Sequence, residues 1–151
     1  MIDKKIFKKA FSAPFDKAGF LKKGQSWFFD GADSIIVVTL EKCDWDELYY
    51  VDVGFWLKEL GQALFPLYYH CHIYERLEFL FPEKRELILT SCDLEKSDAD
   101  LLIDLSEFIL EDVIPFLKGC TNIKKLSELF NMGVFRNSYI NFLARKYLSN
   151  T

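Results

Sequence analysis

The chain has 151 residues, of which half are hydrophobic and 17% are aromatic, and its net charge is −4. This length suffices for one domain with a substantial core, and the apolar content excludes an intrinsically disordered chain. The mild negative charge argues against binding to nucleic acid or to an anionic membrane, because both require a basic face.

The first expected element is a helix that begins after Asp3 and ends at Gly19. Asp3 is a favourable N-cap residue. Apolar residues share one stripe at helical spacing, with lysines outside it: Ile6, Phe7, Ala10 and Phe11. Pro14 should kink the helix or start a new one, and Gly19 can adopt the left-handed conformation that ends many helices.

Three runs rich in β-branched and aromatic residues follow, each with the length of a strand: 26–30, 34–41 and 49–57. Turn residues separate the runs, which favours an antiparallel meander. The third run alternates, so its residues divide between two faces: Tyr49, Val51, Val53, Phe55 and Leu57 against Tyr50, Asp52, Gly54 and Trp56. We expect Val51, Val53 and Phe55 to be nearly fully buried.

Two more segments could extend this sheet. Residues 68–77 are rich in aromatic residues and alternate, so we expect a fourth strand there. Residues 86–91 form either a short fifth strand or a helical turn, because so short an apolar run fits both.

The second half of the chain is expected to be mainly helical. Ser97 should cap its longest helix, with Asp100 three residues later as a variant of the capping box. The core face of this helix repeats at helical spacing: Leu102, Leu105, Ile109, Val113 and Phe116. Pro115 should kink or end the helix, and Gly119 closes it.

Two shorter helices should complete the chain. Thr121 or Asn122 caps the first, and the second covers residues 136–148. One side of the last helix is apolar: Tyr139, Phe142, Leu143 and Tyr147. The expected fold is therefore α+β, an antiparallel β-meander sheet of four to five strands packed against N-terminal and C-terminal α-helices. Without repeats or linker-like runs, residues 1–151 should form a single domain.

The four cysteines are widely spaced and include no Cys-x-x-Cys pair. A domain of this size needs no disulfides, so we expect free thiols in a reducing compartment. The lysine-rich start lacks the apolar stretch of a signal peptide, and no run of about 18 apolar residues could span a membrane. These features favour a cytoplasmic protein.

Several short motifs occur in order along residues 1–130. They are listed here by position: 19–24 (GFLKKG), 36–42 (IVVTLEK), 49–54 (YYVDVG), 71–77 (CHIYERL) and 114–117 (IPFL). Together they resemble an uncharacterised bacterial family, domain of unknown function 4304. The resemblance implies a single cytoplasmic α+β domain with no established activity. The family tends to carry Gln where this chain has Glu41.

The two histidines, His70 and His72, would point the same way on a strand, beside Tyr74 and Arg76. They could supply two ligands to a metal, but no third ligand has diagnostic spacing, so we expect no metal site. Alternatively, this face could bind a small ligand, with Arg76 meeting an anion. It could also be an outer sheet face that the C-terminal helix covers.

No catalytic motif is present. The sequence lacks a Gly-x-Ser-x-Gly elbow, a glycine-rich phosphate loop and a His-Glu-x-x-His pair. We therefore expect a non-enzymatic protein without catalytic residues and without a cofactor.

Two acidic features favour a protein partner instead. The segment 41–47 places Trp45 between Asp44 and Asp46, at the expected tip of a hairpin. Tryptophan is a frequent interface anchor, and carboxylates can steer a basic partner. A second acidic strip follows one helix face: Asp100, Asp104, Glu107 and Glu111.

The preferred hypothesis is thus a protein-interaction module, in its sharpest form an immunity-type protein that neutralises a basic toxin. The competing interpretation is a solvated surface, with Trp45 folded back on the sheet.

Overall fold

Six antiparallel strands form one sheet, and their spatial order follows the chain from β1 to β6. Their bounds are β1 Leu21–Lys23, β2 Ser26–Asp30, β3 Ser34–Lys42, β4 Tyr49–Leu57, β5 Ile73–Arg76 and β6 Tyr139–Ile140. The computed structural model describes all of residues 1–151. The expected meander is confirmed, with the short edge strands β1 and β6 added to it.

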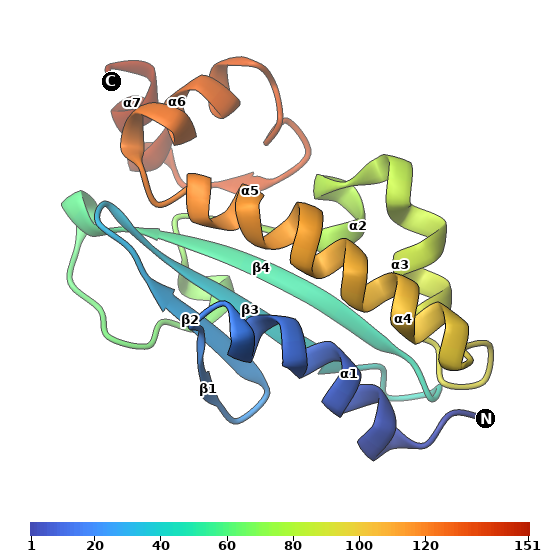
Figure 1. Cartoon of the computed structure of the whole chain (residues 1–151). Helices are drawn as coiled ribbons and strands as arrows, with labels where there is room; N and C mark the ends of the chain where they lie inside the picture. The colour runs from blue at the N-terminus through green and yellow to red at the C-terminus, as the bar shows by residue number, and fades with distance from the viewer.

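Helix α1 precedes the sheet in the chain, helices α2 to α6 lie between β5 and β6, and α7 follows β6. Their bounds are α1 Lys4–Lys17, α2 Leu77–Leu80, α3 Arg85–Ser91, α4 Ala99–Phe108, α5 Ile114–Gly119, α6 Ile123–Asn131 and α7 Phe142–Ser149. Short 3₁₀ turns are η1 Lys58–Leu60, η2 Tyr68–His70 and η3 Pro82–Lys84, and a π-helical turn, η4 Ile109–Val113, joins α4 to α5. Helix α1 and the rod made by α4, η4 and α5 lie on the same side of the sheet (Figure 1).

The main core lies between these helices and one face of the sheet. Val51, Val53 and Phe55 of β4 are at most 1% exposed, as expected from the alternation. Leu105, Ile109 and Val113 belong to the same apolar cluster. Helix α1 adds three phenylalanines: Phe11 and Phe15 pack against the buried Trp27, and Phe7 packs against Phe11 and Tyr49.

The opposite face of the sheet has a much smaller core, made by Phe28, Ile35, Val37 and Cys71. The chain between β4 and β5 folds back over it, with Tyr68 of η2 packed against it. The C-terminal helix does not cover this face, because Ala144 and Leu148 of α7 are buried in the main core. That expectation was wrong.

Gly54 of β4 permits this close covering. A Cβ atom there would lie 2.8 Å from Cys71 Sγ, 2.9 Å from Val37 Cγ1 and 3.0 Å from Tyr68 Cα. Any side chain at this position would push η2 away from the sheet. The glycine is therefore a packing requirement.

The secondary structure of some segments differs from the expectation, because contacts with other parts of the chain decide it. Residues 68–70 form the turn η2, so the strand expected over 68–77 starts only at Ile73. Of the two alternatives for residues 86–91, the helical one is confirmed, because these residues lie within α3. The last helix starts only at Phe142, because Tyr139 and Ile140 pair with β5 as the strand β6. Phe142 and Leu143, which were expected on the apolar side of this helix, are exposed.

The long helix also differs at its start and near its end. Asp98 is its cap, with Oδ1 accepting a 2.8 Å hydrogen bond from Leu101 N, whereas Ser97 is buried. Pro115 neither ends nor breaks the rod. The preceding π-helical turn, in which Ile114 N–H donates to Ile109 O, accommodates the missing proline N–H.

No helix combines the length and the apolar character that a membrane crossing requires.

Candidate functional site

The loop between β3 and β4, residues 43–48, is called the acidic hairpin below. Trp45 at its tip is 91% exposed, and Asp44 and Asp46 on either side are exposed as well. The alternative in which Trp45 folds back on the sheet is therefore wrong. A large indole ring left almost fully in water is unusual, because burial of such a ring is strongly favourable.

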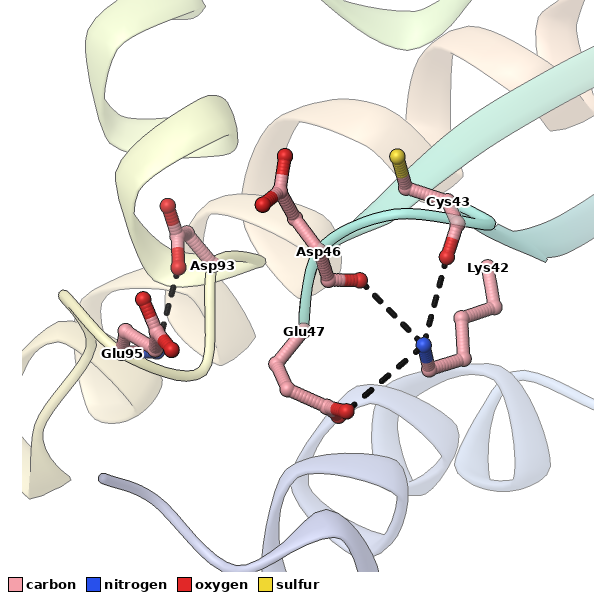
Figure 2. A network of polar contacts seen from close by, with 6 residues as sticks. All are labelled: Lys42, Cys43, Asp46, Glu47, Asp93 and Glu95. Carbon is pink, nitrogen blue, oxygen red and sulfur yellow. Dashed lines mark hydrogen bonds and ion pairs between the residues drawn. The ribbon is translucent and has the colours of Figure 1, made fainter.

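A lysine at the base of the acidic hairpin holds its backbone in place. Lys42 Nζ donates to the carbonyl oxygens of Cys43 and Asp46, both at 3.2 Å, and lies 3.8 Å from Glu47 Oε1. Figure 2 shows these three contacts converging on one ammonium group, while the Asp46 carboxylate points away from it. One side chain thus joins both sides of the loop.

The acidic hairpin is also fixed to the segment that precedes α4. Tyr49 N donates to Cys92 O at 2.9 Å, and Leu94 N donates to Glu47 O at 2.8 Å. Asp93 and Glu95 consequently lie beside the loop (Figure 2) and add negative charge to this end of the molecule. The backbone of the hairpin is ordered although its central side chain contacts little.

The second acidic feature, called the α4 stripe below, runs along the exposed side of the rod. Its four members, Asp100, Asp104, Glu107 and Glu111, are all exposed, and none of them forms an ion pair. Ile103 and Leu110 are also exposed on this rod, at 55% and 38%. The hairpin and the beginning of α4 lie at the same end of the molecule (Figure 1).

The structure separates the two histidines that were expected to share a face. His70 is exposed at the end of η2. His72 is only 7% exposed, its Nδ1 accepts a 2.9 Å hydrogen bond from Leu57 N, and burial lowers its pKa. The expected pair was wrong because η2 replaces the first part of the strand. No group of three or more His, Cys, Asp or Glu side chains is placed to hold a metal ion.

Arg76 and Tyr74 do share a face, and they meet residues of neighbouring strands there. Arg76 lies opposite Asp52 of β4, with Nε 3.6 Å from Asp52 Oδ1. The guanidinium group lies 3.8 Å from the centre of the Tyr50 ring. Tyr74 stacks on Tyr139 of β6, with ring centroids 4.7 Å apart.

These residues line a pocket of about 370 Å³, called the Asp52 pocket below. Its full lining is Asp52, Tyr68, Tyr74, Glu75, Arg76, Phe79, Asn137 and Tyr139. Sequence reasoning placed Arg76 and Tyr74 on a possible ligand face but missed Asp52. The available signal was a carboxylate in the middle of an otherwise apolar strand.

Asp52 and Glu41 are neighbouring carboxyl groups at one side of this pocket. Burial is the main cause that raises the pKa of Asp52 to about 8, and the neighbouring Glu41 is the second. The neighbouring Asp52 carboxyl group lowers the pKa of Glu41, whose Oε2 accepts a 3.0 Å hydrogen bond from Tyr68. At neutral pH the pair therefore carries one proton, held mainly by Asp52.

The cysteines offer no reactive group in the interior. All four are free, and Cys71, Cys92 and Cys120 are buried. Burial raises the pKa of each of these three thiols to about 12, so the nucleophilic thiolate is scarce.

The family model for domain of unknown function 4304 (DUF4304) matches residues 11–119. This range includes the second half of α1, strands β1 to β5 and the rod up to the end of α5, and with them the acidic hairpin. No curated protein and no solved structure matches the chain. Because the family model matches well over half of the residues, the chain belongs to the DUF4304 family.

Proposed function

We propose that this protein is a cytoplasmic, non-enzymatic interaction domain that captures a basic protein through the acidic hairpin. The observation that carries the proposal is Trp45, which is 91% exposed on a loop whose backbone is fixed by hydrogen bonds. In its most specific form, the domain is an immunity-type protein and its partner is a basic toxin.

The order of the loop favours binding by Trp45. Ordering a mobile loop on association costs free energy, and a loop already held by Lys42 and by the segment 92–94 avoids much of that cost. Tryptophan is among the residues most enriched at interface hot spots, where truncation typically costs at least about 2 kcal/mol. Burying the Trp45 ring against a partner would contribute a binding free energy of this size.

The charge around Trp45 favours a basic partner. Asp44 and Asp46 flank it, and Asp93 and Glu95 lie beside the same loop. None of these four carboxylates forms an ion pair, because Lys42 pairs with Glu47. Unpaired carboxylates attract a basic surface during encounter, and this attraction acts over a Debye length of about 8–10 Å. The α4 stripe, which forms no ion pairs, would extend the same field along the rod.

The test is a kinetic titration against the protein encoded by the neighbouring gene. Trp45→Ala should raise the dissociation rate about 30-fold, which corresponds to about 2 kcal/mol. Phe142→Ala is the matched control, because this aromatic ring is 77% exposed on α7, outside the acidic hairpin. Equal losses in both variants, or no loss in Trp45→Ala, would contradict the proposal.

The contribution of charge is measured in the same titration. The double variant Asp104→Lys with Glu107→Lys should mainly lower the association rate, and added salt should lower the wild-type rate steeply. Absence of any binding by the neighbouring gene's product would rule out the immunity-type form of the proposal.

A further inference from the structure

The Asp52 pocket contains a buried acid, one oxygen atom of which has no hydrogen-bond partner in the protein. Asp52 is 4% exposed, and its Oδ2 atom has no hydrogen-bond partner. Its Oδ1 atom lies 3.6 Å from Arg76 Nε, which is too long for a good hydrogen bond. Buried polar atoms without partners are rare in native proteins, and each needs an explanation.

The pocket is large enough for a small metabolite. Its volume of about 370 Å³ lies in the range of small-molecule sites, which are mostly lined by aromatic and apolar side chains with a few polar groups. Four of its eight lining residues are aromatic: Tyr68, Tyr74, Phe79 and Tyr139. The carboxyl group of Asp52 supplies a polar group that could orient a ligand.

The charge balance favours a cation in the pocket. Carboxyl groups of Glu41, Glu75 and Glu78 act on this region, whereas Arg76 is the one cation that lines the pocket. Aromatic ring faces also attract cations. An anion would have to approach these carboxylates and compete with Asp52 for Arg76.

The position of Arg76 leaves room for such a cation. Its guanidinium group lies over Tyr50, on the side of Asp52 toward the acidic hairpin. Tyr74 lies opposite Gly54, on the other side of Asp52 along β4, where it stacks with Tyr139. The aromatic part of the pocket is thus displaced from the positive charge of Arg76.

We propose that the Asp52 pocket binds a small organic ammonium ion, which pairs with Asp52 and takes the place of its proton. An organic cation is favoured over a metal ion, since no cluster of three metal-ligating side chains is present. This site is separate from the acidic hairpin and does not depend on the proposed capture of a protein.

Proton release gives the proposal a distinctive pH dependence. The charged and titratable groups that face Asp52 are Glu41 from β3, Tyr68 from η2, Arg76 from β5 and Glu78 from α2. Burial raises the pKa of Asp52 to about 8, so below that pH an ammonium ion must displace one proton. Its affinity should therefore rise with pH, by up to about tenfold per unit, and level off above about pH 8.

The experiment is calorimetric titration of the full chain with 1,5-diaminopentane, and with glutarate as an anion of the same carbon length. Measurements at several pH values, each in two buffers of different ionisation enthalpy, count the protons released. We expect the diamine to bind with release of up to one proton at pH 6.5, and glutarate not to bind. Binding of glutarate alone, or no binding of either probe at 10 mM (about the weakest useful affinity), would overturn the proposal.

Variants assign the binding to the pocket. Asp52→Asn should abolish both diamine binding and proton release, whereas Asp112→Asn, which changes an exposed carboxylate on η4, should bind as the wild type does. If Asp52→Asn does not fold, Tyr139→Ala provides the second test, because it removes a half-exposed ring and should weaken binding several-fold. Unchanged binding in Asp52→Asn, or in Tyr139→Ala, would place the diamine elsewhere and overturn the proposal.

Discussion

The two faces of β4 differ in what they contribute to the molecule. The five residues on one face are almost completely buried in the main core: Tyr49, Val51, Val53, Phe55 and Leu57. The other face carries Tyr50, Asp52, Gly54 and Trp56, and lies beneath an irregular segment and beside a pocket. The first face supplies most of the apolar burial, and the second brings polar groups of the neighbouring strands β3 and β5 close to Asp52.

The alternation of apolar and polar residues along a strand determines only part of how the strand is packed. Period-two alternation identifies the face that helices will cover, because burial of alternate apolar residues is the dominant favourable term. It does not identify what covers the other face. Here the covering segment depends on Gly54, which lets η2 approach the sheet, and the uncovered end becomes the Asp52 pocket.

The largest effect is expected on the apolar face. Phe55→Ala should lower the free energy of unfolding by about 3–5 kcal/mol, through lost burial and a cavity. Denaturant titration measures this change, and Phe142→Ala should alter stability little because that ring is 77% exposed. Equal effects of the two substitutions would contradict the division between a packed face and an exposed helix surface.

A pH-dependent effect is expected on the polar face. The folded protein holds the Asp52 proton up to about pH 8, whereas the unfolded chain loses it near the ordinary value of 3.8. The folded state therefore binds more protons in this window, and its stability falls as pH rises from about 4 to 8. Asp52→Asn removes this dependence and should gain about 2–3 kcal/mol relative to the wild type between pH 5 and pH 8.

Denaturant titrations at the two pH values measure this gain, with Asp112→Asn as the control. If the free energy of unfolding changes with pH in the same way in the wild type and in Asp52→Asn, the pKa of Asp52 is not raised by folding and the prediction is contradicted.

A smaller effect is expected where η2 meets the sheet. Gly54→Ala should cost about 1–2 kcal/mol, because the added Cβ would overlap Cys71 Sγ and Val37 Cγ1. Gly119→Ala is the matched control, since its nearest neighbour would be Lys125 Cγ at 3.8 Å, an ordinary contact. A neutral Gly54→Ala would mean that the covering segment packs more loosely than described.

Much of the fold could be predicted because its signals are local. Residues 26–57 carry their own alternation and turn residues, and Asp3 and Gly19 mark the ends of α1 as expected. By contrast, Tyr139–Ile140 forms β6 only because β5, more than 60 residues earlier, offers an edge. The choice between the adjacent caps Ser97 and Asp98 likewise depends on burial, which the sequence does not state.

The two candidate sites also differ in whether local sequence or long-range packing forms them. The exposure of the acidic hairpin follows from a local turn between two strands, so its residues could be named from the sequence. The Asp52 pocket combines residues of β4, β5, β6 and η2, and only the folded sheet places them together. The hydrogen bond at His72 depends equally on long-range packing.

The most direct test of the proposed function follows Trp45 itself during binding. The protein can be labelled with 5-fluorotryptophan, which gives one ¹⁹F resonance for each of its three tryptophans, with Trp45 assigned through Trp45→Phe. On addition of the neighbouring gene's product, we expect the Trp45 resonance to shift and lose its solvent exposure, while Trp27 in the core and the half-buried Trp56 stay unchanged. A complex that forms while the Trp45 resonance stays at its free position would contradict capture through the acidic hairpin.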